Sequence, residues 1–200
     1  MKKLIHTVLY VFLSASLLLI GCGKKAEDDY FETTLKFEKN GKITDVIVES
    51  FSEDYYSEDG LKAFFQEKIS DYTSSNIGKG AVKLNELSVE NGKAKATLEF
   101  DDSEAYNTFY GMVSFYGTVS DAYDKGYITE TVLKKVGSSD TISKIDLMKM
   151  SDSDIIVVNE VVRIESPKKI EYASANVEVL DEKTARVSSD STGFAYLVLK

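Results

Sequence analysis

The sequence predicts an α+β fold with a mostly antiparallel sheet, and three observations support this prediction. Two stretches in the first half of the chain alternate apolar and polar residues, as strands do, and each is followed by a segment with helical periodicity. From residue 154 onward, short strand patterns follow one another, separated by turn residues. The order ββα, ββα and then a strand-rich C-terminal part favours this class, because runs of strands without intervening helices pair antiparallel.

A secretory signal peptide is predicted at the start of the chain. Two lysines come first, residues 4–20 carry no charge if the single histidine, His6, is neutral, and the segment ends on the small residue Gly21. A basic start, an apolar segment and a small residue at the cleavage point are the parts of such a signal. We therefore expect residues 1–21 to be absent from the mature protein.

The four residues around the predicted cleavage point, Leu19-Ile20-Gly21-Cys22, resemble the lipobox of bacterial lipoproteins of the Firmicutes, or clostridial, type. The resemblance implies that the Cys22 thiol receives a diacylglyceryl group and that acyl chains such as palmitate hold the protein at the extracytoplasmic face of the cell membrane. Each buried methylene contributes about 0.8 kcal/mol, and two chains anchor stably where one is marginal.

An uncleaved signal anchor is the alternative interpretation of this segment. A membrane span needs about 20 apolar residues, and this segment also carries His6, Thr7, Ser14 and Ser16. A third interpretation is a buried core helix. The two lysines before the segment and the polar residues after it argue against this interpretation.

The composition of the predicted mature chain limits its partners. Removal of residues 1–21 leaves 179 of the 200 residues, and since the lost segment holds two lysines, the formal charge changes from −9 to −11. So acidic a surface disfavours nucleic acid and anionic lipid headgroups as partners. The size suits one domain or a small pair of domains.

The residue types that are missing exclude several classes of enzyme. The only histidine is His6, the only cysteine is Cys22, and there is no tryptophan. The mature chain therefore cannot build a serine or cysteine triad with histidine, or a zinc site with nitrogen or sulfur ligands. The classes that remain are carboxylate chemistry, Ser-Lys chemistry, the binding of oxygen-ligand metals such as Ca²⁺, and a protein without catalysis. Among these we expect no catalytic residues, no metal and no cofactor.

The first folded unit is expected after a short tether. Residues 22–29, the lipidated Cys22 and a small, charged stretch, have no periodicity and are typical of a flexible linker. Order is expected from Tyr30, with a strand, an Asn40-Gly41 hairpin turn and a second strand. A helix is predicted over residues 57–72, with Ser57 as N-cap.

A second stretch repeats this pattern as far as residue 126. Strand patterns flank the turn Asn91-Gly92, and a helix is expected from about Asp102 to Gly126 with Asp101 and Glu104 as a capping box. The two units together form a ββαββα region over residues 30–126. They are either a duplication or two Asn-Gly hairpins that look alike by chance.

A β-rich C-terminal region is predicted over residues 127–200 and expected to pack with the first as one domain. Residues 127–150 show no clear period, whereas Ile155 to Ile164 is mostly Val and Ile, as expected for a strand buried on both faces. Pro167 interrupts this pattern. Further strands are predicted over the following residues: 169–173, 176–180, 184–187 and 194–199.

Two acidic clusters are candidate metal sites. They are Asp152 with Asp154, and Asp101 with Asp102 and Glu104. Neither has the glycine and glutamate spacing of an EF-hand loop, so solvated turn and helix-cap roles are preferred. The one Ser-x-x-Lys match, Ser166 to Lys169, spans Pro167 and is interpreted as chance.

Four tyrosines form a possible binding surface. Tyr55 and Tyr56 lie in an acidic connection, and Tyr106 and Tyr110 share one flank of the second predicted helix. Exposed tyrosines stack through the ring and hydrogen-bond through the hydroxyl, which suits glycan and protein ligands. The alternative is that these rings fill the edge of the core.

The sequence therefore predicts a non-enzymatic envelope lipoprotein of unknown specific activity, with a protein or glycan partner or a structural role. The alternatives are a carboxylate-based glycan-active enzyme, a Ca²⁺-dependent binding module, or a subunit of a larger complex that pairs through an exposed apolar strand at Ile155 to Ile164. Two closing segments are Lys169-Ile170-Glu171-Tyr172 and Gly193-Phe194-Ala195-Tyr196. Together with the general layout of the chain, they resemble uncharacterised small lipoproteins of clostridia, and this resemblance implies no activity.

Overall fold

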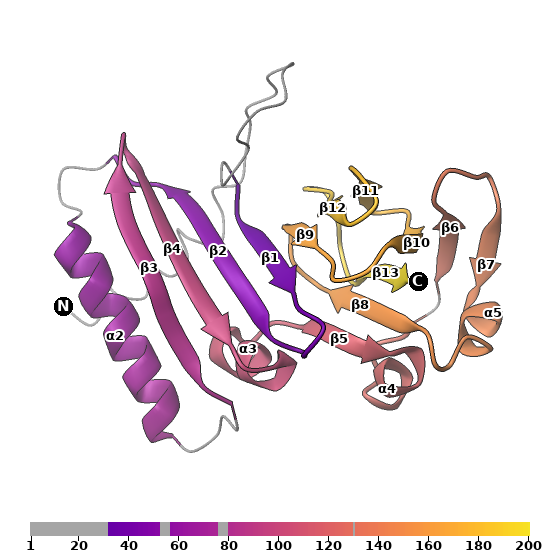
Figure 1. The fold of residues 1–200 in the computed structure, drawn as a ribbon, viewed down its shortest axis with the longest axis horizontal. Coiled ribbons are helices and arrows are strands. Elements are labelled where there is room, and N and C mark those ends of the chain that lie inside the picture. Colours follow the sequence, from indigo (N-terminus) through magenta and orange to yellow (C-terminus); the bar gives the residue numbers. More distant parts are fainter. Residues whose placement is uncertain (1–31, 53–56, 76–79, 130) are drawn as a thin grey trace.

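The computed structural model describes residues 32–52, 57–75, 80–129 and 131–200. This part of the chain is an α+β structure with two mostly antiparallel sheets and four helices, which confirms the predicted fold class (Figure 1). None of the helices in these ranges has the length and apolar character that a membrane crossing requires. The predicted signal segment, Cys22 and the tether lie outside the described residues.

The larger sheet contains seven strands in the order β11-β12-β9-β1-β2-β4-β3. Its strands are β1 (Thr34–Phe37), β2 (Ile43–Ser50), β3 (Val82–Glu90), β4 (Lys93–Phe100), β9 (Arg163–Glu165), β11 (Val177–Val179) and β12 (Thr184–Val187). β1 pairs parallel with β9 and antiparallel with β2. The sheet thus joins strands from the two ends of the described chain.

Both predicted Asn-Gly turns are present in this sheet. Gly41, between β1 and β2, has a φ of +88°, while Asn91 and Gly92, between β3 and β4, have φ values of +51° and +73°. At Asn91-Gly92, two consecutive residues with positive φ make the turn that matches the twist of antiparallel strands. In the first hairpin only Gly41 has a positive φ, and the connection is longer, with the Gly41 N–H donating to the Glu38 oxygen at 3.0 Å. Both predicted hairpins are therefore present, and the tight two-residue turn is confirmed for the second.

The smaller sheet contains six strands in the order β5-β8-β13-β10-β6-β7. Its strands are β5 (Ser114–Thr118), β6 (Val132–Lys135), β7 (Thr141–Ser143), β8 (Asp154–Val158), β10 (Ile170–Ser174) and β13 (Ala195–Leu199). Four successive residues of β8, from Ile155 to Val158, have an exposed fraction of 0%. This strand is buried on both faces, as its unbroken Val and Ile content predicts.

The first predicted helix is confirmed as α2 (Glu58–Ser74), which lies alongside β3 at one end of the molecule (Figure 1). The Ser57 side chain accepts a hydrogen bond from the Gly60 N–H at 3.1 Å, so Ser57 is the predicted N-cap. The helix buries Leu61, Phe65 and Tyr72. Their spacing of four and seven residues places all three on one face of the helix.

The second predicted helix is much shorter than expected, because α3 (Ser103–Tyr110) ends where the chain was expected to continue helically to Gly126. Gly111 follows in the left-handed conformation with a φ of +71°, which a glycine adopts without strain and which stops the helix. The chain then forms β5, whose backbone pairs with β8, and α4 (Val119–Asp124). The second half of the predicted helix is therefore partly a strand.

The N-cap of α3 also differs from the predicted capping box. Asp102 is the cap and accepts from the Ala105 N–H at 2.8 Å. Asp101 accepts instead from the backbone N–H of Ala81 at 2.8 Å, which ties the start of β3 to the end of β4. The Asp101 carboxylate, predicted to cap the helix, therefore binds the backbone just before β3.

The stretch from Ile155 to Ile164 is two strands in different sheets and not one. β8 ends at Val158, residues 159–162 cross over, and β9 begins at Arg163. β8 lies between β5 and β13, and β9 lies between β12 and β1, so neither is at a sheet edge. The idea that this stretch pairs with another protein as an exposed edge loses its basis.

Residues 127–150, which the sequence left open, contain the hairpin of β6 and β7 followed by α5 (Lys144–Met148). Ser143 and Asp146 form a capping box at the start of this helix. The predicted C-terminal strands correspond to β10, β11, β12 and β13.

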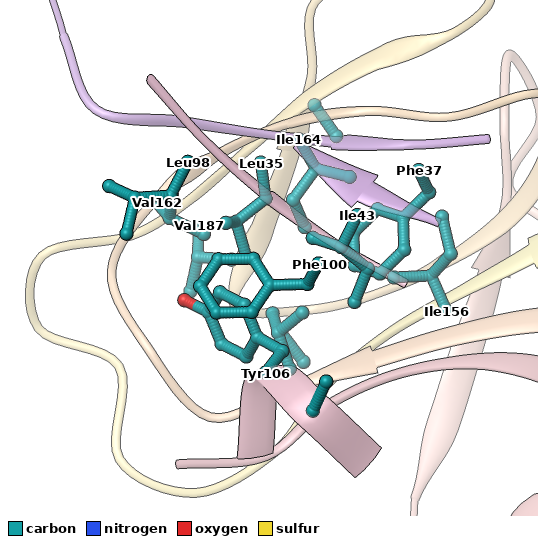
Figure 2. Packing of buried hydrophobic residues seen from close by; sticks show 14 of the residues in the cluster. Leu35, Phe37, Ile43, Leu98, Phe100, Tyr106, Ile156, Val162, Ile164 and Val187 are labelled. Atoms are coloured by element: carbon teal, nitrogen blue, oxygen red, sulfur yellow. The ribbon is translucent and has the colours of Figure 1, made fainter. Parts of the chain in front are cut away.

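The core consists of two apolar clusters: the larger contains residues of both sheets, and the smaller contains residues of the six-stranded sheet, α4 and α5. Alternate residues of β8 divide between them: Ile156 and Val158 face the larger cluster, while Ile155 and Val157 face the smaller one. Figure 2 shows the larger cluster, in which Leu35 and Phe100 pack with side chains from the C-terminal region. Residues on both sides of the predicted boundary at residue 126 thus share this cluster.

Candidate functional site

An aspartate lies inside the larger cluster, on the middle of β2. Asp45 stands opposite Leu35 of β1 and Leu98 of β4 in the strand register and is 3% exposed. Because side chains alternate along a strand, Asp45 shares the inward face of β2 with Ile43 and Ile47. A carboxyl group buried among aliphatic side chains is costly unless it is neutral or well bonded.

Helix α3 supplies the hydrogen bond to this carboxyl group. The Tyr110 hydroxyl donates to Asp45 Oδ2 at 2.7 Å. The other oxygen, Asp45 Oδ1, is buried and has no hydrogen-bond partner among the described residues. Only one of the two Asp45 carboxyl oxygens therefore accepts a hydrogen bond within the described part of the chain.

A second tyrosine of α3 bonds to a second carboxyl group. The Tyr106 hydroxyl donates to Glu160 Oε1 at 2.9 Å, and Glu160 lies in the connection between β8 and β9. Tyr106 is 2% exposed and Glu160 is partly buried. Figure 2 shows the Tyr106 ring beside Phe100, with its hydroxyl at the margin of the cluster.

The two tyrosines act from neighbouring positions on one helix face. Residues four apart in a helix lie one turn above each other, and the rings of Tyr106 and Tyr110 have centroids 4.8 Å apart. Phe100 of β4 packs against both rings, with centroid distances of 5.0 and 5.6 Å. The aromatic packing fixes where the two hydroxyl groups point, and hence which carboxyl group each one meets.

The surroundings raise the pKa of both carboxyl groups. Burial raises the pKa of Asp45 to about 7, and the Tyr110 hydrogen bond opposes part of this effect. Burial, followed by the nearby charge of Asp45, raises the pKa of Glu160 to about 8. The pKa of each tyrosine is raised well above its ordinary value, mainly by burial and then by the neighbouring carboxyl groups. At neutral pH the network therefore holds protons that ordinary carboxyl groups would have lost.

A third carboxyl group with a raised pKa lies on the same face of β2. Glu49 stands four residues after Asp45 and opposite Ala94 of β4. Burial alone raises its pKa to about 7. It differs from the other two because no tyrosine bond or charged neighbour contributes to that shift.

The arrangement is suited to holding protons and joining elements. Within the described ranges no three or more carboxylate, histidine or cysteine groups are placed to hold a metal ion. Asp45 is too deeply buried to meet a substrate without movement of its surroundings. The four side chains Asp45, Glu160, Tyr106 and Tyr110, called the tyrosine–carboxyl network below, connect β2, α3 and the β8–β9 connection.

The predicted tyrosine surface is wrong for Tyr106, which is buried in the core instead of exposed. Tyr110 is partly buried, and its hydroxyl is bound to Asp45. Tyr55 and Tyr56 lie outside the described residues. For the two tyrosines of α3, the alternative that they fill the edge of the core is confirmed, because α3 turns this flank toward β2 and β4.

The carboxyl groups of the network were missed by sequence reasoning. The signal for Asp45 is its position between Ile43 and Ile47 on alternating positions of one strand, which share a face. Glu160 lies within the Ile155 to Ile164 stretch, which is interpreted from its Val and Ile content alone. No sequence pattern indicated that two residues 115 positions apart would lie near one helix.

The acidic clusters and the serine have local roles. Asp102 caps α3, as the preferred interpretation predicts. Asp154 is not a turn residue: it begins β8, accepts from the Tyr116 hydroxyl at 2.9 Å and pairs with Lys168 Nζ at 2.7 Å. Ser166 donates its hydroxyl to the backbone oxygens of Lys168 and Lys183, consistent with a chance Ser-x-x-Lys match.

Comparison with known proteins gave no matching family model, no matching curated protein and no matching solved structure. A function for this chain must therefore follow from its own residues and geometry.

Proposed function

We propose that the chain is a lipoprotein of the cell envelope, anchored through lipid on Cys22 at the outer face of the membrane, and that its folded part is a non-catalytic binding or structural module. The observation that carries this proposal is the motif Leu19-Ile20-Gly21-Cys22 at the end of an uncharged apolar segment. Its partner is an envelope protein or a glycan, and its acidic charge argues against nucleic acid.

The first described residues support the proposal, because they are fastened strongly to the sheet. Arg186 of β12 binds Glu32 through two hydrogen bonds of 2.9 and 2.6 Å, and Arg163 of β9 lies 3.7 Å from the same carboxylate. A bidentate arginine–carboxylate pair resists displacement. Nine residues lie between Cys22 and Glu32, so the ten Cα–Cα steps that join them span at most roughly 35 Å. A lipid on Cys22 would therefore keep the folded part close to the membrane surface.

The tyrosine–carboxyl network supports a module without catalysis. A glycan-active enzyme of the carboxylate type needs two carboxyl groups that face the scissile bond from either side. Here Asp45 is 3% exposed, and both Asp45 and Glu160 accept hydrogen bonds from tyrosines of α3. These hydrogen bonds join parts of the fold, and the burial of Asp45 supports a structural role for the pair.

The raised pKa values of Asp45 and Glu160 favour a second candidate, a carboxylate-based glycan-active enzyme. Raised carboxyl pKa values are also typical of general acids. Release of reducing sugars from purified cell-wall glycan separates the two. The leading proposal predicts none, and release that Glu160→Gln abolishes would establish the enzyme.

We also propose that the order β1-β2-α2-β3-β4-α3 is the ββα-ββα plan suggested by the sequence. The two helices differ in length, with 17 residues in α2 and 8 in α3. In this proposal α3 is the shorter helix because the chain continues directly after it as β5, a strand of the six-stranded sheet.

The anchoring is tested with the full chain expressed in a lipoprotein-processing bacterium. We expect the wild-type protein in the membrane fraction, and the Cys22→Ser variant to lose the lipid mass. A Cys22→Ser variant identical to wild type in mass and in membrane retention would favour the uncleaved signal anchor and contradict the proposal. Crosslinking in intact cells followed by affinity capture then identifies the partner, with Cys22→Ser as the mislocalised control.

A further inference from the structure

We propose that the tyrosine–carboxyl network is a proton-dependent latch, which holds the β8–β9 connection against α3 while its carboxyl groups carry protons and releases that connection when they ionise. This inference goes beyond the proposed function and does not depend on lipidation. It rests on the positions, bonds and burial of Asp45, Glu160, Tyr106 and Tyr110.

The latch joins three elements that are distant in sequence. The Tyr110–Asp45 bond fastens α3 to the larger sheet, and the Tyr106–Glu160 bond fastens the same helix to the connection between the sheets. A second contact supports that connection: Asn159 Oδ1 accepts from the Val113 N–H at 2.8 Å, and the Asn159 N–H donates to the Val113 oxygen at 3.1 Å. Release of residues 159–162 therefore requires the segment after α3 to loosen as well.

The groups around Asp45 explain why its charge state matters. Neighbouring strands present Leu35 from β1 and Leu98 from β4, and the second sheet presents Ile156 to the same cluster. None of these side chains can ionise or neutralise a charge.

Besides burial, the Tyr110 hydrogen bond acts on Asp45 and lowers its pKa, while the charge of Asp45 raises the pKa of Glu160 and the Tyr106 hydrogen bond lowers it. The next carboxyl group on the inward face of β2 is Glu49. Arg163, at the start of β9, pairs with Glu32. A buried carboxylate with one hydroxyl donor and no cation is unfavourable.

The two carboxyl groups differ in how they can respond to ionisation. Asp45 lies on a strand paired on both sides, so its backbone is fixed. Glu160 is partly exposed and belongs to the short connection between β8 and β9. When the network ionises, Glu160 is therefore the group that turns to water, and this breaks its bond with Tyr106.

The direction of the response follows from proton binding. The closed latch binds protons more tightly than the open one, because burial outweighs the opposing Tyr110 hydrogen bond and raises the pKa of Asp45 to about 7. Burial and the charge of Asp45 together raise the pKa of Glu160 to about 8. A fall in pH therefore closes the latch, and a rise through these values opens it. The two groups titrate as a coupled pair.

Hydrogen exchange followed by mass spectrometry tests the latch on the full purified chain. Peptides covering residues 103–113 and 157–164 are compared at pH 6 and pH 9, after correction for the intrinsic pH dependence of exchange. Each unit by which the closed-state pKa exceeds the open-state pKa corresponds to a tenfold change in the opening equilibrium. We expect protection of these peptides in wild type to fall at least tenfold from pH 6 to pH 9, and to change less than threefold in Glu160→Gln.

Glu49→Gln is the matched control, since it removes a carboxyl group with a raised pKa from the same strand face without touching α3. It should keep the full pH response of the two peptides. A wild-type response below threefold, or an equal response in wild type and Glu160→Gln, overturns the latch.

A carboxyl ¹³C NMR titration of the wild type keeps the proposal falsifiable if a variant fails to fold. Two coupled carboxyl titrations above pH 6 that also shift the Tyr106 ring signals support the latch. Titration of both groups near pH 4 would overturn it.

Discussion

Replacement of Asp45 by Asn removes the most deeply buried ionisable carboxyl group of the latch while keeping its shape. The amide oxygen can still accept from the Tyr110 hydroxyl, which lies 2.7 Å from Asp45 Oδ2 in the wild type. The variant cannot ionise, so the pH dependence that Asp45 contributes to stability disappears.

The size of this effect follows from the pKa of Asp45, which burial raises from 3.8 to about 7. Each unit is worth about 1.4 kcal/mol, so the whole shift corresponds to about 4 kcal/mol. Because the folded state has the higher pKa, this contribution to stability is complete below pH 3.8, declines as the pH rises toward 7, and is constant above it. Between pH 5 and pH 8 the free energy of unfolding of the wild type therefore falls by about 3 kcal/mol through Asp45, and the Asp45→Asn variant lacks this decrease.

Urea unfolding followed by circular dichroism measures this difference directly. The free energy of unfolding of Asp45→Asn, relative to wild type, should rise by about 3 kcal/mol between pH 5 and pH 8, equivalent to a change on the order of 10 °C in relative Tm. Any constant cost of the amide cancels in this comparison. A relative stability that is the same at both pH values would refute the reasoning, because Asp45 would then titrate near its ordinary pKa.

Glu99→Gln serves as the control for that experiment. Glu99 lies on the opposite face of the sheet, and its hydrogen bond with Lys42 at 2.6 Å lowers its pKa. Its ionised form is therefore the favoured one in the folded state. The relative stability of this variant should fall slightly with rising pH, opposite in sign to Asp45→Asn.

Three further substitutions test the fold. Leu98→Ala, at a position that is 0% exposed, should cost about 2–5 kcal/mol in urea unfolding; a loss below 1 kcal/mol would contradict the packing of the larger cluster. Ser57→Ala should cost about 1 kcal/mol by removing the cap of α2, and an unchanged stability would argue against that cap. Gly111→Ala should cost about 1 kcal/mol, since the φ of +71° strains alanine; a more stable variant would show that α3 continues past this residue.

Local sequence signals predicted the elements that depend on neighbouring residues. The two Asn-Gly turns, the Ser57 cap and most C-terminal strands were predicted because turn chemistry, capping and alternation act over a few positions. The β8 run was predicted to be buried on both faces because an unbroken apolar strand fits no solvated face. These features need no knowledge of what packs against them.

The errors occurred where distant contacts decide the structure. The helix predicted to Gly126 stops at Gly111 because β5 pairs with β8, about 40 residues later. Ile155 to Ile164 divides between two sheets because each half finds different partners, β13 for one and β1 for the other. The exposure expected for Tyr106 was wrong for the same reason, since Phe100 and Glu160 cover a flank that looked polar in sequence.

Intact-mass and fragment-ion spectrometry of the protein extracted from membranes determines whether Cys22 carries the lipid. We expect a mature chain that begins at Cys22, with the mass of a diacylglyceryl thioether on its sulfur. A protein that retains its initial methionine, or a chain with an unmodified thiol at position 22, would contradict the anchor and, with it, the proposed place of this protein in the cell envelope.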